Sequence, residues 1–311
     1  MSEIIVVGSI NMDLTMSTKI FPNAGETVLG DSFQTDLGGK GANQAIAAAN
    51  LGAEVSMIGS VGNDLYGKLS CDNLANNGVS VADIIVQENT PSGTAMIILC
   101  DSDNRIIVNS GANALLSPKH LRGKADLFTS AKVVLSQLET PLETVQEAFL
   151  IAKENHCLTV LNPSPICELP ASLLELTDIL VLNEHEASHL VNRPIKNVLD
   201  AEESIPLLLH LGVRDVILTL GALGCVYTMQ GKTFYHPARK VSAVDTTGAG
   251  DSFTGAIVYS LAKDISMEQA ISLATLVSSV TVTRKGTSSS FPKIKEVKKI
   301  LKKEGIDIAL S

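Results

Sequence analysis

Short apolar runs alternate with helix-forming stretches along most of this chain. The apolar runs, each of strand length, are residues 4–7, 55–58, 133–135, 159–161, 179–181 and 215–219. The helix-forming stretches are residues 44–51, 65–76, 144–155, 184–191, 251–263, 267–280 and 293–304. Strands and helices in alternation predict an α/β fold with a central, mostly parallel sheet and helices on both of its faces.

Two segments in the N-terminal half do not follow this alternation. Residues 27–34 and 95–109 are strand-like, and in the second segment a turn at residues 101–104 separates two apolar runs. That pattern predicts a β-hairpin. We therefore expect a small β-sheet lid, with strands drawn from about residues 12–36 and 93–110, that covers a site and excludes water from it.

The composition is that of a globular protein. The chain is expected to form one domain over residues 1–311, with 45% hydrophobic and 18% charged residues. Its net charge of −9 argues against general binding to nucleic acid or to an anionic membrane. The five cysteines form no C-x-x-C pair, no signal sequence precedes the first strand, and no apolar run has the length of a membrane span. These features predict a cytoplasmic protein with reduced thiols.

A glycine-rich turn precedes the helix expected at residues 251–263. In its sequence, V-D-T-T-G-A-G-D-S-F, Gly248 and Gly250 allow a sharp turn and a close approach of the backbone to a ligand. Asp251 follows directly. The free N–H groups at the start of such a helix attract phosphate, and a carboxylate there can accept a proton from an attacking hydroxyl. The alternative is a plain turn in which Asp251 is the N-cap.

Polar side chains recur where the predicted strands end. They are Asn11, Asp13, Glu139, Asn162, Asn183, Glu186 and Thr219, with Asp245 just before the glycine turn. Open α/β sheets bind ligands at the carboxyl ends of their strands. Each residue alone could be a helix cap or part of an Asx-turn, but several on one edge favour a ligand site. There Asn11 and Asp13 could hold neighbouring hydroxyls of one small molecule.

The segment G-G-K-G-A-N at residues 38–43 is a second glycine-rich candidate. It is not a Walker phosphate loop, because Lys40 is followed by Gly41 where that pattern has Ser or Thr. Lys40 and Asn43 still offer side-chain donors to a ligand. The alanine-rich stretch that follows indicates tight packing of a helix.

The expected helix at residues 184–191 contains the pattern H-E-x-x-H. His185, Glu186 and His189 could therefore form part of a zinc-protease site. No third ligand is evident in the sequence. The alternative, which we favour, is a pair of solvent-facing histidines on a helix.

Several motifs occur together in a fixed order. They are G-S-I-N-M-D (8–13), G-G-K-G-A-N-Q-A (38–45), L-N-P-S-P (161–165), N-E-x-E-A (183–187), D-T-T-G-A-G-D (245–251) and V-T-R-K-G-T (282–287). This set spans nearly the whole chain and resembles the ribokinase family of sugar and nucleoside kinases. The resemblance implies a ribokinase-like fold and an ATP-dependent transfer of the γ-phosphate to the 5-hydroxyl of ribose.

The resemblance also implies a role for each matching residue. Asp251 would take the proton from the hydroxyl, while the backbone N–H groups of Ala249, Gly250 and Asp251, after Gly248, would form an anion hole. Ribose would be held by Asn11, Met12, Asp13, Gly39, Lys40, Gly41, Ala42, Asn43, Glu139 and Asp251. The nucleotide would lie along Asn183, Thr219, Leu220, Gly221, Ala222, Leu223, Gly224, Gly250 and Thr275.

Two cations and a second copy of the chain are implied in the same way. Glu186, with Asn183, would organise Mg²⁺ largely through water. An activating K⁺ would lie beside the anion hole, with ligands from Asp245, Thr247, Thr281, Arg284, Gly286 and Ser290. Arg284 could contribute only its carbonyl, because its side chain carries no acceptor. The lid strands would form the contact of a homodimer.

The choice of substrate leaves alternatives. Kinases that resemble this chain also act on fructose, adenosine and 2-deoxyribose, and residues 286–290 depart from the expected family pattern. Asn11 favours ribose over 2-deoxyribose, because a polar group left unpaired at a missing hydroxyl costs about 1–3 kcal/mol. A non-catalytic sugar or nucleotide sensor is a further alternative, which the intact glycine turn before Asp251 argues against.

Overall fold

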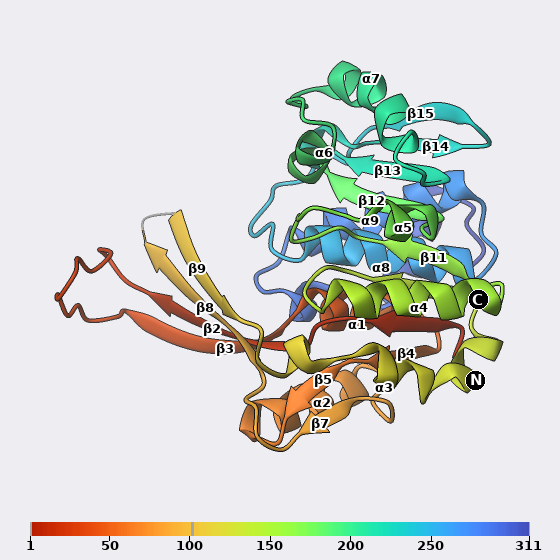
Figure 1. Ribbon diagram of the computed structural model, residues 1–311. Helices are drawn as coiled ribbons and strands as arrows, with labels where there is room; N and C mark the ends of the chain where they lie inside the picture. The colour runs from red at the N-terminus through yellow and green to blue at the C-terminus, as the bar shows by residue number, and fades with distance from the viewer. Residues whose placement is uncertain (1, 101–102, 311) are drawn as a thin grey trace.

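A nine-stranded sheet forms the centre of the computed structural model, which describes residues 2–100 and 103–310 (Figure 1). Its strand order is β15-β14-β13-β12-β11-β10-β1-β4-β6. All neighbours from β13 to β6 are parallel, and β14 and β15 continue the sheet as antiparallel strands at one edge. The sheet therefore confirms the predicted, mostly parallel α/β architecture. The strands are β1 (Ile4–Val7), β4 (Val55–Ile58), β6 (Val79–Ser80), β10 (Val133–Ser136), β11 (Leu158–Leu161), β12 (Ile179–Asn183), β13 (Asp215–Thr219), β14 (Cys225–Met229) and β15 (Lys232–His236).

Helices cover both faces of this sheet, as predicted. Successive side chains of a strand point to opposite faces, so Ile4 and Val6 of β1 enter one hydrophobic cluster while Ile5 and Val7 enter another. The first cluster includes α1 (Lys40–Asn50), α2 (Leu65–Asn76), α8 (Ala249–Ala262), α9 (Met267–Thr281) and α10 (Ile294–Glu304). The second includes α3 (Pro118–Arg122), α4 (Leu142–Glu154), α5 (Ala171–Glu175), α6 (Glu184–Leu190) and α7 (Val198–Leu209).

A separate four-stranded sheet extends away from this body as a flat arm (Figure 1). Its order is β3-β2-β8-β9, with β2 and β8 parallel and both outer pairs antiparallel. The strands are β2 (Asn11–Ser17), β3 (Ser32–Gly38), β8 (Gly93–Cys100) and β9 (Asp103–Asn109). We call this sheet the lid. A two-stranded parallel sheet, β5 (Ser60–Gly62) with β7 (Ile85–Gln87), lies in the part of the body that precedes β8.

The lid differs from the prediction in its strand boundaries. The strand expected at residues 27–34 begins only at Ser32, where pairing with Ser17 of β2 starts. Leu29, which precedes it, is 91% exposed. In the predicted turn at residues 101–104, positions 103 and 104 already pair with β8, while 101 and 102 lie outside the described residues.

Both helices that follow glycine-rich segments begin earlier than predicted. α1 begins at Lys40 and not at residue 44, because Gly39 adopts a φ of 87° and turns the chain there. α8 begins at Ala249, after Gly248 with a φ of 75°, so Gly248 is the N-cap and Asp251 lies within the first turn. The alternative in which Asp251 is the N-cap is therefore wrong. None of the helices in the described part of the chain is long and apolar enough to cross a membrane.

Candidate active site

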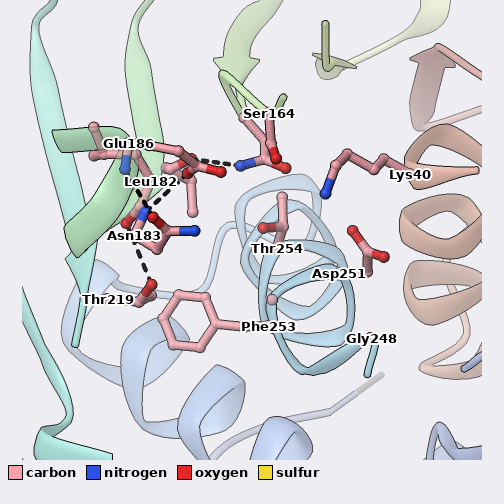
Figure 2. Close-up of a pocket in the computed structure, with 13 residues that line it drawn as sticks. Lys40, Ser164, Leu182, Asn183, Glu186, Thr219, Gly248, Asp251, Phe253 and Thr254 are labelled. Carbon is pink, nitrogen blue, oxygen red and sulfur yellow. Dashed lines mark hydrogen bonds between the residues drawn. The ribbon is translucent and has the colours of Figure 1, made fainter. Parts of the chain in front are cut away.

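The candidate site lies at the carboxyl edge of the central sheet, beside β1. β4 pairs with one side of β1 and β10 with the other, so the order of the strands reverses there, which is where open α/β sheets bind ligands. α1 and α8 both begin near this edge. Lys40 and Asp251, from the first turns of these helices, line one pocket with Asn183, Glu186 and Thr219 (Figure 2).

Asp251 is held by two amide side chains of α1. The Nδ2 of Asn43 donates to its Oδ2 at 3.0 Å, and the Nε2 of Gln44 donates to its Oδ1 at 2.9 Å. Burial raises the pKa of Asp251, against the opposing effect of the Lys40 ammonium and of the two amide donors. A carboxylate with a raised pKa and a fixed orientation is suited to accept a proton.

The glycine turn before Asp251 brings the start of α8 against the C-terminal part of the chain. A Cβ atom on Gly248 would lie 2.9 Å from side-chain carbons of both Thr287 and Phe291, so only glycine fits there. Gly250 and Asp251 lie in the first turn, where a helix provides no acceptor for their N–H groups. The N–H of Ala249, in contrast, donates to the carbonyl of Thr246 at 3.2 Å.

Lys40 and Glu139 connect α1 to the end of β10. One carboxylate oxygen of Glu139, Oε2, accepts the backbone N–H of Lys40 at 3.0 Å and the hydroxyl of Ser9. Burial alone would lower the pKa of Lys40, but the nearby carboxylates, above all Asp251, hold this pKa above its ordinary value. The Lys40 ammonium is therefore a permanent positive charge beside Asp251.

Asp13 stands at the base of the lid. Burial, together with the negative charges of Glu139, Asp36 and Asp251, raises the pKa of Asp13 to about 7. Asp36 is its direct partner across β2 and β3. A Cβ atom on Gly38 would lie 2.0 Å from the Asp13 carboxylate, so this glycine leaves room for the charged group.

A second pocket, of about 450 Å³, lies between the base of the lid and the body. It is lined by Asn11, Val108, Ser110, Asn113, Ala114, Leu138, Glu139, Thr140, Pro141 and Pro165. Two predicted sugar-binding residues, Asn11 and Glu139, thus share one cavity. The other pocket, of about 210 Å³, contains Lys40 and Asp251 with the predicted phosphate-side residues.

The predicted magnesium residues form the cap of α6. The Oδ1 of Asn183 accepts the N–H groups of His185 and Glu186, both at 2.9 Å, and the Oε2 of Glu186 accepts the N–H of Asn183 at 2.9 Å. This reciprocal pairing is a capping box. Both residues also line the pocket, so the cap orients the Nδ2 of Asn183 and the second oxygen of Glu186 as the groups left for a ligand.

The zinc interpretation of H-E-x-x-H finds no support. In residues 2–100 and 103–310, no group of three or more His, Cys, Asp or Glu side chains could hold a metal ion. Glu186 is occupied in the capping box with Asn183. Its burial at the start of α6 follows from that cap.

Several other residues predicted to contact the ligands line neither of these two pockets. The side chains of Met12, Ala42, Leu220 and Thr275 are all buried. The N–H groups of Gly41 and Ala42 are engaged by Ser9, and Gly41 packs directly on the backbone of Gly8. Of the segment after β13, Thr219 lines the pocket, whereas Leu223 is 45% exposed and Gly221 and Gly224 adopt positive φ values.

The hydrogen bonds of the predicted potassium residues form two groups, one around Asp245 and one around Arg284. The two carboxylate oxygens of Asp245 accept the N–H groups of Thr247 at 3.0 Å and Gly286 at 3.1 Å, and these bonds hold the pKa of Asp245 below its ordinary value despite partial burial. Arg284 points its side chain to the carbonyl of Ser290 at 3.4 Å and to Glu296. The backbone carbonyl of Thr281 accepts the N–H of Arg284 at 3.1 Å.

Several polar residues at the site were missed by the sequence reasoning. Ser9, Asn113, Ser164 and Thr254 line the pockets or hold residues that do, and Gln137 donates to Gln44, which in turn holds Asp251. Gln44 belongs to a motif that was recognised, but its contact with Asp251 was not foreseen. Adjacent residues of a helix do not share a face, so helical spacing gives no reason to expect that Asn43 and Gln44 reach one carboxylate. Nothing in the sequence links either of them to position 251.

Similarity to known proteins identifies the family of this chain. A model of the pfkB family of carbohydrate kinases matches residues 1–294. The chain belongs to the pfkB carbohydrate kinase family. It is 40% identical to a ribokinase of Schizosaccharomyces pombe, over 96% of this chain and 97% of that protein. It is 34% identical to a deoxyribokinase of Salmonella typhi, over 96% of this chain and 98% of that protein.

The fold of this chain is also similar to that of solved structures. The structure of Arabidopsis thaliana ribokinase, complexed with ribose and ATP, superimposes with a TM-score of 0.92 at 32% identity, covering 97% of this chain and 99% of that one. The predicted ribokinase-like fold and family are therefore confirmed. Family membership makes this pfkB carbohydrate kinase a phosphotransferase that acts on a sugar hydroxyl.

Proposed function

We propose that this protein transfers the γ-phosphate of ATP to the 5-hydroxyl of ribose. The observation that carries the proposal is the place of Asp251. It lies in the first turn of α8, in the pocket that also contains Lys40, Asn183 and Thr219, and it is bonded to Asn43 of α1. The relatives named above include a ribokinase that aligns over nearly its full length and a ribokinase structure with ribose and ATP.

The proposed reaction needs few chemical groups from the protein. Asp251 accepts the proton of the sugar hydroxyl as its oxygen forms a bond to the γ-phosphorus, and the bond from that phosphorus to the β-phosphate oxygen breaks to release ADP. The N–H groups of Gly250 and Asp251 and the Lys40 ammonium stabilise the charge on the transferring group. The N–H of Ala249 can join them only if it leaves the carbonyl of Thr246.

Mg²⁺ fits the phosphate side of this pocket. When bound, it would neutralise phosphate charge. Glu186 has one carboxylate oxygen outside the capping box with Asn183, which suits contact with the ion through water. A site with a single carboxylate agrees with the preference of Mg²⁺ for water and phosphate oxygens.

An activating K⁺ is proposed beside Asp245. The Asp245 carboxylate supplies oxygens there, and hard cations prefer carboxylate and backbone carbonyl oxygens. The Arg284 side chain lies against the carbonyl of Ser290 and would have to share it. Equal rates in K⁺ and Na⁺ would remove this part of the proposal.

The lid is proposed as the contact of a homodimer. Met96, Leu99, Ile106, Ile107 and Val108 are all exposed by 39–67% on β8 and β9. Because strand residues alternate between faces, Met96 and Ile107 lie on one face of the lid and Leu99, Ile106 and Val108 on the other. Exposed apolar side chains of this kind mark an interaction surface. We also propose a cytoplasmic location, with the five free cysteines as reduced thiols.

An assay of ADP release with ribose, 2-deoxyribose, fructose and adenosine tests the function. We expect the highest kcat/KM with ribose. Turnover of another of these substrates in preference to ribose would replace the substrate and keep the kinase activity. Binding of sugar and ATP without any ADP release would instead indicate a sensor.

A further inference from the structure

Asn113 is a buried amide at the base of the lid that none of the recognised motifs contains. It lies in the short 3-10 helix η1 (Gly111–Leu115), directly after β9, and is 1% exposed. Its Oδ1 accepts the backbone N–H of Ile10 at 2.9 Å. Its Nδ2 donates to the carbonyl of Ile10 at 3.1 Å and to the Oδ1 of Asn11 at 2.7 Å. One side chain therefore binds both polar groups of residue 10 and the side chain of residue 11.

These bonds fix the orientation of two amides. Asn113 must place its oxygen on the N–H of Ile10 and its nitrogen on the carbonyl, because the opposite orientation would satisfy neither group. The nitrogen of Asn113 then faces Asn11, so Asn11 presents its oxygen to it. The Nδ2 of Asn11 is left as a donor for another partner, and Asn11 lines the 450 Å³ pocket.

Gly93, the first residue of β8, makes room for this pair of amides. A Cβ atom there would lie 2.2 Å from the Oδ1 of Asn11 and 2.2 Å from the Nδ2 of Asn113. Contacts this short do not occur, so any larger residue at this position would displace one or both side chains. Gly93, at the start of β8, and Asn113, in η1 after β9, thus both act on the side chain of Asn11.

Glu139, which lines the same pocket as Asn11, offers an acceptor. The Oε2 of Glu139 is occupied by Ser9 and by the backbone N–H of Lys40, which leaves Oε1 for a ligand. A sugar hydroxyl can donate to this carboxylate oxygen, and a second hydroxyl oxygen can accept from the Nδ2 of Asn11. The pocket is therefore matched to a sugar with several hydroxyls.

We propose that Asn113 is a specificity-determining residue for the sugar, because it holds Asn11 as a hydrogen-bond donor toward the substrate. The inference rests on the proposed function, in which Asn11 contacts ribose. A deoxy-sugar that lacks the hydroxyl opposite Asn11 leaves a buried donor unpaired, which corresponds to a discrimination of about tenfold to a hundredfold. Asn113 acts through Asn11 and needs no contact with the sugar.

The test compares Asn113→Asp and Gly93→Ala with the wild-type protein, using ribose and 2-deoxyribose. Asn113→Asp replaces the donor that faces Asn11 by an acceptor, so Asn11 must turn its amide. Gly93→Ala forces the same two amides apart without changing either of them. We expect kcat/KM for ribose to fall about tenfold to a hundredfold in both variants, with a much smaller loss for 2-deoxyribose and an unchanged KM for ATP.

Gly123→Ala is the matched control, because a Cβ atom there meets its nearest neighbours at an ordinary 3.6 Å. If Asn113→Asp does not fold, Gly93→Ala carries the test. In an Asn11→Ala background, Asn113→Asp should cost little further ribose activity. An equal fold-loss of kcat/KM for ribose and 2-deoxyribose would leave their ratio unchanged and would reject the role of Asn113. A wild-type protein without ribose turnover would reject the proposed function itself.

Discussion

The central sheet and the lid sheet are built from similar strands but differ in how their faces are covered. All four residues of β1 are fully buried, because helices pack on both sides of it. In β3 the first four residues are exposed, and Ile107 of β9 is 67% exposed. A sheet buried on both faces is a rigid support, whereas a sheet with an open apolar face gains stability only when something covers it.

The residues of the candidate site are likewise divided between the body and the lid. Asp251, Lys40 and the cap of α6 stand on helices of the body, so the groups at the phosphate side are fixed before any ligand binds. Asn11 and Asp13 stand on β2, at the base of the lid. We infer that the body supplies the chemistry, while the lid shares recognition of the sugar with Glu139 of the body.

The largest effect is expected from Asp251→Asn. The amide keeps the shape of the side chain but cannot take up the proton, so kcat should fall about 10²–10⁴-fold. KM for both substrates should change little, because the body remains folded. Steady-state kinetics with both substrates measures this. A loss of binding as large as the loss of kcat would show that Asp251 has a structural role.

The body should be sensitive to truncation of its core. Leu135 of β10 is fully buried in the cluster that also contains α1 and α8. Leu135→Ala should lower the free energy of unfolding by about 2–5 kcal/mol, through lost burial and the cavity left behind. Denaturant unfolding measures this value. A cost well below that range would mean that the body tolerates change better than its burial indicates.

An effect of pH is expected at the base of the lid. Because the pKa of Asp13 rises from an ordinary 3.8 to about 7, the folded protein keeps a proton there that the unfolded chain loses. The contribution of Asp13 to stability should therefore fall as pH rises from about 4 to about 7, and stay low above that.

Sugar binding should show the opposite trend. The ionised carboxylate of Asp13 is the better acceptor for a hydroxyl, so KM for ribose should rise as pH falls below about 7. Unfolding and kinetics at about pH 5 and about pH 8, for the wild type and Asp13→Asn, measure both trends. The same pH dependence in Asp13→Asn would assign it to another group.

The smallest effect is expected on the open face of the lid. Ile107→Ala removes apolar surface that is already largely in water, so the free energy of unfolding of the monomer should change by no more than about 0.5 kcal/mol. Leu135→Ala is its counterpart in the body. A cost above about 2 kcal/mol, as for a core residue, is expected only where the proposed homodimer covers this face, and sedimentation velocity would then show the second copy.

Much of the body could be predicted because its strands are short, apolar and buried on both faces, which leaves a clear pattern. The antiparallel strands β14 and β15 were missed. The edge position of β15 gives a mixed pattern in which Lys232 and Thr233 are exposed, whereas β14 lies inside the sheet and is buried over its first four residues. Lid strands were expected within residues 12–36, but β2 was not delimited there as a strand of its own. Its residues are only partly buried, and its pairing with β8 depends on a segment about 80 residues away in the sequence.

The sequence alone determined the α/β class, the kinase family and the candidate base, because these depend on local periodicity and on short motifs whose backbone needs glycine. Only the tertiary structure decided which amides hold Asp251 and Asn11. The partners of these two residues lie 207 and 102 positions away, and hydrogen bonds over such separations leave no local pattern. Gln44 and Asn113 acquire their roles only when the chain has brought α1 to α8 and η1 to the start of β2.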